Sequence, residues 1–223
     1  MSEVMENIVL HNSDAIKLME SMPDNSIDVI ITDPPYGING QYNSFVDTKE
    51  NLKSLIEQFL PKAKRIAKLV AIITGVKNME FYNGCDWRLA WVVPAGNGIG
   101  PWGFNCWTPI SVYGKDPYLE KSLGSRPDTF VDKSPKRKGY GHPYEKPESI
   151  MDWLINRLSF QNQIIFDPFM GSGTTGVSAL KYGRKFVGCE LDIEYFSVSK
   201  KRILDTKCQI SIFDFNIEQT SIF

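Results

Sequence analysis

Short runs of β-branched and aliphatic residues alternate along the chain with longer stretches whose apolar residues repeat about every 3.6 positions. The short runs predict buried strands, and the longer stretches predict helices with one face on a core. The expected strands are 7–10, 27–32, 69–73, 87–93, 110–113, 163–166 and 185–189. The expected helices are 16–22, 51–68, 147–158, 174–182 and 193–204. This alternation predicts an α/β fold with a mostly parallel sheet covered by helices on both faces.

Two segments lack such a pattern. Residues 94–108 are rich in glycine, proline and asparagine and predict a long aromatic loop. Residues 114–141 show no periodicity and contain three prolines, which is typical of an exposed excursion. We therefore expect a single domain over 1–223 with a loop-rich excursion at 94–141.

The composition is that of one globular domain. A chain of 223 residues with 42% hydrophobic and 23% charged side chains is unlike a disordered or collagen-like polymer. The apolar runs are far shorter than the roughly 18 residues of a membrane span, and the N-terminus lacks the basic start of a secretory signal, so we expect a cytoplasmic protein. Four cysteines without CxxC spacing and two histidines predict neither a disulfide framework nor a metal site.

Charge is unevenly distributed, although the net charge is only −1. Residues 1–50 contain two basic and nine acidic side chains, whereas residues 51–146 contain fifteen basic and eight acidic ones. The middle of the chain could face an anionic polymer such as a nucleic acid, or could simply carry solvated helix faces.

A glycine-rich turn joins one predicted strand to the helix that follows it. Gly171, Gly173 and Gly176 satisfy GxGxxG there, and Glu190 ends the next strand, where a carboxylate can bind ribose hydroxyls. The pattern is typical of a nucleoside-containing cofactor site, although a tight strand-to-helix connection would also use glycines. Asp167 precedes the turn and would repel the pyrophosphate of a dinucleotide, but it suits an ammonium group. The turn therefore favours S-adenosylmethionine over NAD.

A second motif, Asp33-Pro34-Pro35-Tyr36, follows the strand predicted at 27–32. The two prolines fix the backbone and supply no amide hydrogens, so the turn is stiff and its carbonyls can accept hydrogen bonds. At the carboxyl end of a parallel strand, this ledge faces the crevice where α/β sheets bind ligands. Taken alone, it could equally be a proline turn with Tyr36 packed on the sheet.

The two motifs together resemble those of the β-class DNA amino-methyltransferases, the N6-adenine and N4-cytosine family. The family pattern also fits at Asp14 with Leu18, at the HPYEKP segment 142–147 and at the ELD segment 190–192, so the matching pieces span positions 14 to 192. The resemblance implies a Rossmann-like methyltransferase domain with circularly permuted motif order. The resemblance extends to small phage or prophage members of the family. The chain is short for the family, and no separate target-recognition domain is visible.

The resemblance also implies roles for individual residues. The catalytic residues would be Asp33, Pro34, Pro35 and Tyr36, with the Asp33 carboxylate and the Pro34 carbonyl bonding the exocyclic amine of a base flipped out of double-stranded DNA, and with Tyr36 stacking on that base. The cofactor S-adenosylmethionine would be bound by Asp14, Lys146, Pro147, Asp167, Phe169, Gly171, Gly173, Thr174 and Glu190, with Lys146 and Pro147 near its methionine end. Asp14 suits a helix N-cap equally well, and His142 is expected to be structural.

Several further segments are assigned only provisional roles. Trp102, Phe104, Trp107 and the basic cluster at 133–138 make the excursion the candidate for DNA recognition, although the aromatics could cap the core and the cluster could be a solvated loop. The 37–45 loop is expected to cover the flipped base. The apolar residues of 208–223 are expected to pack on the sheet or on a partner subunit, and family habit favours a homodimer.

The sequence leaves more than one substrate and more than one class of reaction open. The resemblance implies adenine N6, because the cytosine-N4 members of the family often carry serine where this chain has Asp33. Cytosine N4 is the runner-up, and an RNA base or a protein amide is a weaker choice. An NAD-binding redox protein would use the same glycine pattern. A module that binds the donor without catalysis would keep the glycine turn but would not depend on Asp33.

Overall fold

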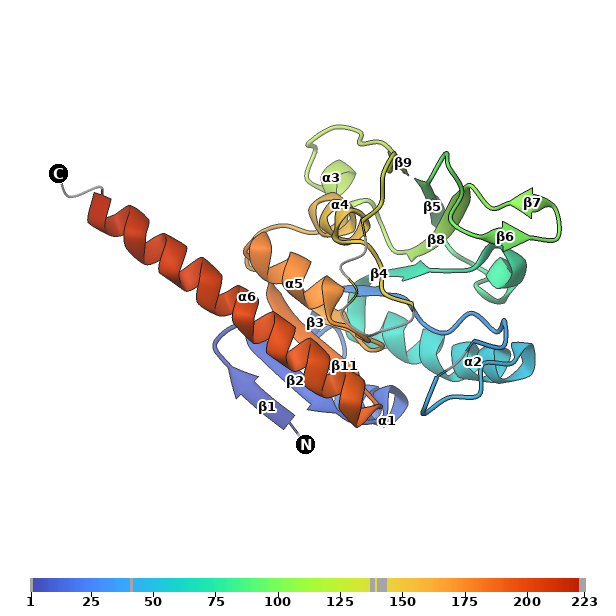
Figure 1. The fold of residues 1–223 in the computed structure, drawn as a ribbon, viewed down its shortest axis with the longest axis horizontal. Helices are drawn as coiled ribbons and strands as arrows, with labels where there is room; N and C mark the ends of the chain where they lie inside the picture. The colour runs from blue at the N-terminus through green and yellow to red at the C-terminus, as the bar shows by residue number, and fades with distance from the viewer. Residues whose placement is uncertain (1, 41, 137–138, 140–143, 221–223) are drawn as a thin grey trace.

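The computed structural model describes residues 2–40, 42–136, 139 and 144–220, with side chains described up to residue 210. A nine-stranded sheet forms its centre, in the order β1-β2-β11-β10-β3-β4-β8-β5-β9 (Figure 1). The strands are β1 (Ser2–Met5), β2 (Ile8–Asn12), β3 (Ile27–Thr32), β4 (Ala67–Ile73), β5 (Trp87–Val92), β8 (Trp107–Tyr113), β9 (Thr129–Val131), β10 (Ile164–Asp167) and β11 (Lys185–Glu190). Five of the eight neighbouring pairs are parallel, which confirms the predicted mostly parallel sheet.

Helices cover both faces of the sheet, as predicted. On one face α1 (Ala15–Ser21) and α2 (Lys49–Ile66) pack through residues such as Met19 and Phe59. On the other face lie α4 (Glu148–Leu158), α5 (Thr174–Lys181) and α6 (Ile193–Thr220), with Leu154 and Ile203 in the core. The remaining short helices are α3 (Pro117–Glu120) and a 3-10 helix at Val76–Phe81. In the described part of the chain no helix is long and apolar enough to cross a membrane.

The chain leaves the two central strands in opposite directions. From β10 it passes through α5 to β11 on one side, and from β3 it passes through α2 to β4 on the other. In an open α/β sheet, the crevice at such a reversal of strand order is the usual ligand site. Because β3 and β10 are parallel neighbours, with Val29 opposite Ile165, both sequence motifs begin at this crevice.

The excursion contains regular structure that the sequence did not predict. Its first part forms a small hairpin, β6 (Ile99–Gly100) and β7 (Gly103–Phe104). Its second part contributes α3 and the edge strand β9, which pairs with β5. The prediction of loop alone was wrong here because elements of two to four residues are too short to show a hydrophobic period.

Both ends of the chain also differ from expectation. Strand β1 was not predicted; it pairs with β2 through a tight turn in which Asn7 has φ of 65°. Helix α6 was predicted to end at 204 but runs to Thr220, because residues 205–220 contain no glycine or proline to stop it. Figure 1 shows its last part leading away from the sheet, so of the two expectations for 208–223, packing on the sheet is wrong for 208–220. Packing on a partner subunit stays a prediction.

Candidate active site

A cavity of about 630 Å³ lies at the carboxyl edge of the sheet and is lined by both sequence motifs. Nine of the predicted residues line it: Asp14, Asp33, Pro35, Lys146, Asp167, Phe169, Gly171, Thr174 and Glu190. Pro34 and Tyr36 line a smaller hollow of about 20 Å³, which shares Asp33 and Lys146 with the cavity. Gly173 and Pro147 line neither; they are the N-cap residues of α5 and α4.

The glycine turn is shaped by close packing against α6. Gly173 has φ of +80°, in the left-handed region, and a Cβ there would lie 3.0 Å from the Cβ of Ser199. Both facts require glycine. The packing on α6 therefore fixes the shape of the turn at the start of α5, where Gly171 and Thr174 line the cavity.

Asp167 ties the two motifs together. Its carboxylate accepts hydrogen bonds from the Thr32 hydroxyl at 2.7 Å, the Thr175 hydroxyl at 2.6 Å and the Phe169 amide at 3.1 Å. Burial raises the pKa of Asp167 to about 7. The sequence predicted an ammonium partner for this carboxylate; the structure adds a fastening role between β3 and α5.

Glu190 and Asp14 also line the cavity. The Glu190 carboxylate accepts the Gly171 and Asp192 amides, each at 2.9 Å, and burial raises its pKa. A carboxylate has about four acceptor positions, so two bonds leave capacity for ribose hydroxyls. Asp14 accepts the Lys17 amide at 3.0 Å and caps α1, which confirms the N-cap interpretation, and it also lines the cavity.

The Asp33 motif forms a compact polar cluster. The Tyr36 hydroxyl donates to Asp33 Oδ1 at 2.6 Å, and the Lys146 ammonium lies 2.6 Å from Asp33 Oδ2. Burial, together with the neighbouring Asp33 charge, raises the pKa of Tyr36, so the phenol stays protonated. The Asn78 side chain donates to the Tyr36 carbonyl at 2.6 Å and fixes the end of the ledge.

Asp47 organises the loop that follows the motif, and no pattern in the sequence marked it as important. Its buried carboxylate accepts the amides of Gly37, Ile38 and Gly40 at 2.6, 3.1 and 2.9 Å. One carboxylate thus accepts hydrogen bonds from three backbone amides of the loop, and this gives the loop a fixed shape. Only the contacts across the loop identify the residue, because no motif surrounds it in the sequence.

The same loop reaches over the cavity. Residues 42–45 line it, and the Ser44 hydroxyl donates to Asp192 at the start of α6 at 3.2 Å. The 37–45 loop was expected to cover a flipped base; the described residues border both the small hollow and the larger cavity, and Gln41 lies outside them.

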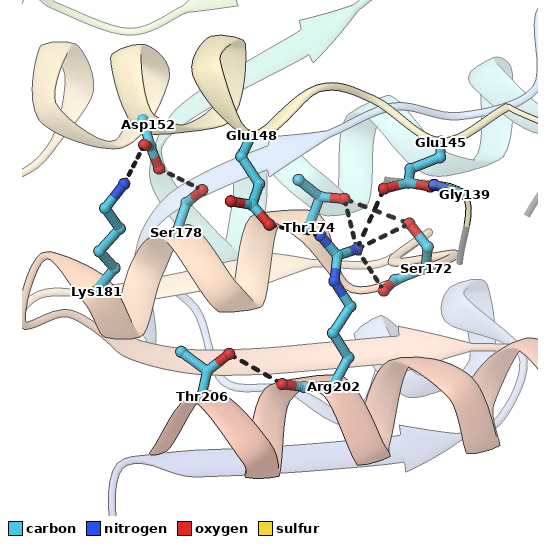
Figure 2. Close-up of polar contacts among 10 residues, drawn as sticks. All are labelled: Gly139, Glu145, Glu148, Asp152, Ser172, Thr174, Ser178, Lys181, Arg202 and Thr206. Carbon is cyan, nitrogen blue, oxygen red and sulfur yellow. Dashed lines mark hydrogen bonds and ion pairs between the residues drawn. The ribbon is translucent and has the colours of Figure 1, made fainter. Parts of the chain in front are cut away.

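Arg202 is a further buried residue that sequence reasoning missed (Figure 2). Its guanidinium donates to the Ser172 carbonyl at 3.1 Å, the Thr174 hydroxyl at 3.0 Å and Glu148 at 2.9 Å, and it lies 3.8 Å from Glu145. It thereby joins α6 to the glycine turn and to the segment that carries Lys146.

The excursion presents the aromatic residues that the sequence singled out. Trp102 is fully exposed at the tip of the β6–β7 hairpin, and Phe104 is 75% exposed. Trp107 is more covered, at the start of β8. Lys133 and Lys136 are exposed, whereas Arg137, Lys138 and His142 lie outside the described residues.

Comparison with known proteins places this geometry in context. Residues 76–201 match the N6/N4 DNA methylase family, and residues 2–92 match an RMKL-like methyltransferase domain. The chain is 26% identical over 246 residues to the DNA adenine methyltransferase YhdJ of Escherichia coli K12, covering 87% of this chain and 82% of that protein.

Solved structures share the fold. The PvuII cytosine-N4-specific DNA methyltransferase superposes with a TM-score of 0.67 at 18% identity, covering 93% of each chain. The M1.HpyAVI–SAM complex superposes with a TM-score of 0.62 at 24% identity, covering 87% of this chain and 99% of that one. The chain therefore has the same overall fold as these two DNA methyltransferase structures.

Proposed function

The chain belongs to the N6/N4 DNA methylase family, and we propose that it transfers a methyl group from S-adenosylmethionine to the exocyclic N6 of an adenine flipped out of duplex DNA. Because the chain belongs to this family, the alternative of an NAD-binding redox protein is excluded. The observation that carries the proposal is the meeting of two motifs in one cavity: Asp33 of the first and Gly171 of the second both line it.

The cavity residues suit the methyl donor. S-adenosylmethionine supplies an activated methyl group on a sulfonium, next to an amino-acid end and a ribosyl adenine. Glu190 offers a carboxylate for the ribose hydroxyls, and Gly171 of the glycine turn lines the cavity next to it. We propose that Asp14, Asp167, Phe169, Gly171 and Thr174 complete the donor site, with Lys146 and Pro147 at its methionine end.

The Asp33 motif suits the acceptor. The lone pair of an exocyclic amine is delocalised into the ring, so the amine is a poor nucleophile. Hydrogen bonds to the Asp33 carboxylate and the Pro34 carbonyl favour a pyramidal nitrogen whose lone pair can attack the methyl group. Stacking on Tyr36 is worth on the order of 1–3 kcal/mol, and alignment of nitrogen, methyl and sulfur supplies much of the rest.

Adenine is the proposed base because Asp leads the motif. Cytosine N4 is the second candidate, since the PvuII enzyme that shares the fold is named cytosine-N4-specific. An RNA base or a protein amide remains a weaker alternative, and each would appear as label in a different polymer.

We propose that the excursion 94–141 contacts DNA within a single methyltransferase domain over 1–223. Exposed aromatic side chains at the β6–β7 hairpin, Trp102 and Phe104, are unusual on a surface that faces only water. Lys133 and Lys136 can bind phosphates. In Figure 1 the hairpin projects on the side of the sheet towards which β4 runs, the same side as the carboxyl edge.

A transfer assay identifies the product. The protein is incubated with methyl-labelled S-adenosylmethionine and unmethylated DNA of several sequences, and the digest is analysed by nucleoside mass spectrometry. We expect N6-methyladenine from the native protein, none from Asp33→Ala, and normal product from Asp152→Ala, whose carboxylate pairs with Lys181 outside the cavity. N4-methylcytosine would change the base, and label only in RNA or polypeptide would refute the DNA substrate.

A further inference from the structure

Lys146 lies directly on the proposed base site. Its ammonium is 2.6 Å from Asp33 Oδ2 and 4.9 Å from the centre of the Tyr36 ring. The side chains of Lys146 and Asp33 are only 12% and 16% exposed, so the pair is largely removed from water. The other carboxylate oxygen, Oδ1, accepts the Tyr36 hydroxyl at 2.6 Å.

The proposed reaction asks the same two groups to bind the target base. The Asp33 carboxylate would accept an N–H of the exocyclic amine, and the Tyr36 ring would stack on the base. An ammonium on the Asp33 carboxylate and over the Tyr36 ring makes the same kinds of contact, a donated hydrogen bond and a cation–π contact. Lys146 therefore contacts both groups that the target base would use, the Asp33 carboxylate and the Tyr36 ring.

We propose that Lys146 competes with the target base for Asp33, so that the ammonium must leave the carboxylate before the amine can bind. This inference rests on the proposed function, because it concerns the base site of that reaction. Lys146 also lines the larger cavity, which gives the side chain a direction in which to withdraw. A base binds only if the free energy of its own contacts exceeds that of the Lys146–Asp33 ion pair. Lys146 therefore lowers the affinity of the site for a base.

The chain offers a matched control in Lys181. Its ammonium lies 2.5 Å from Asp152 and 5.2 Å from the centre of the Tyr182 ring, which repeats the carboxylate–lysine–tyrosine arrangement. Figure 2 shows Lys181 and Asp152 on α5 and α4, and neither residue lines the cavity. Removal of a lysine from such a cluster can thus be separated from removal of a lysine from the base site.

The test measures binding of small probes to the whole protein. Affinities for 2′-deoxyadenosine and 2′-deoxycytidine are determined by saturation-transfer NMR with S-adenosylhomocysteine present, for the native protein, Lys146→Met and Lys181→Met. We expect Lys146→Met to bind the cognate nucleoside roughly three- to tenfold more tightly than the native protein, because no ion pair has to be displaced. Lys181→Met should bind it as the native protein does.

Two further variants keep the test decisive. Lys146→Gln is a second neutral variant, used if Lys146→Met has a lowered melting temperature. Lys146→Arg keeps the positive charge and should show no gain in nucleoside affinity. Unchanged or absent nucleoside binding in the neutral variants would overturn the proposal, as would a loss of S-adenosylhomocysteine affinity without any gain for the nucleoside. If the native protein methylates DNA while these variants show no gain, the inference fails alone; if the native protein binds no donor, the proposed function fails with it.

Discussion

At the scale of single residues, Asp167 combines a fastening role with an unusual ionisation. Burial raises its pKa to about 7, whereas an aspartate in an unfolded chain titrates near pH 4. Between these values the folded protein holds a proton that the unfolded chain has lost. Stability therefore falls as the pH rises through this window, which is the opposite of the trend for an aspartate in a salt bridge.

Asp167→Asn removes this ionisation while keeping one acceptor for Thr32. We expect the melting temperature of the native protein to fall when the pH is raised from about 5 to about 8, and to fall by a few degrees more than that of the variant. For a chain of this size, a loss of about 1 kcal/mol lowers the melting temperature by about 2–4 °C. Calorimetry at both pH values measures the difference. Parallel pH profiles for the two proteins would show that Asp167 does not titrate in this range.

The residues that the sequence revealed are those that lie within local motifs. Asp33 follows a strand and directly precedes two prolines, and Glu190 ends the strand that follows the glycine-rich turn, so the positions of both could be inferred. Asp47 and Arg202 could not be found in this way, because each acts through contacts that only the folded chain creates. The Lys146–Asp33 pair likewise joins residues more than a hundred positions apart.

At the scale of elements, Arg202 holds α6 against the glycine turn. Arg202→Met removes the bonds to Ser172, Thr174 and Glu148 and leaves buried acceptors behind. Breaking one side of a buried ion pair costs about 3–5 kcal/mol, and the turn should lose its shape for the donor as well. We expect a fall of this order in the free energy of unfolding and weaker S-adenosylmethionine binding, measured by urea titration and calorimetry.

Lys181→Met is the control for this prediction. The Lys181 side chain in its ion pair is about half exposed, and surface pairs contribute about 0–1 kcal/mol. A loss of stability no larger in Arg202→Met than in Lys181→Met would contradict the role given to Arg202.

The long elements were predictable and the short ones were not. Strand β3 matches its prediction at both ends, and α2 is shifted by two residues at each end. Both elements are long enough for their repeated apolar positions to show the period of a strand or a helix. Strand β9 has three residues and forms only by pairing with β5. The end of α6 depends on the absence of a stop signal, which a pattern of apolar residues does not reveal.

At the scale of the whole molecule, exposed lysines of the excursion define a candidate DNA surface. Replacing both Lys133 and Lys136 by methionine should weaken DNA binding about equally for all sequences. The salt slope should fall by about 1 for each phosphate that is no longer neutralised. Fluorescence anisotropy over a range of salt concentrations measures this slope.

The matched double variant replaces Lys181 and Lys185. Both lie at the opposite edge of the sheet, at the end of α5 and the start of β11. This variant should leave the slope unchanged. Equal slopes in all three proteins would remove Lys133 and Lys136 from the DNA surface.

Assembly is a second prediction at this scale. We expect a homodimer of about twice the 25.3 kDa chain mass in light scattering after size-exclusion chromatography. A single-chain mass over a range of micromolar concentrations would contradict it.

The central claim is that Asp33 acts on the amine while the glycine turn binds the donor. Single-turnover methyl transfer with Asp33→Asn, on DNA already bound with labelled S-adenosylmethionine, tests it most directly. We predict a chemical step slowed by about 10²–10³, as when one preorganised polar group is removed from an active site, with donor affinity unchanged. A native rate in the variant would contradict the account, and so would a loss explained entirely by weaker donor binding.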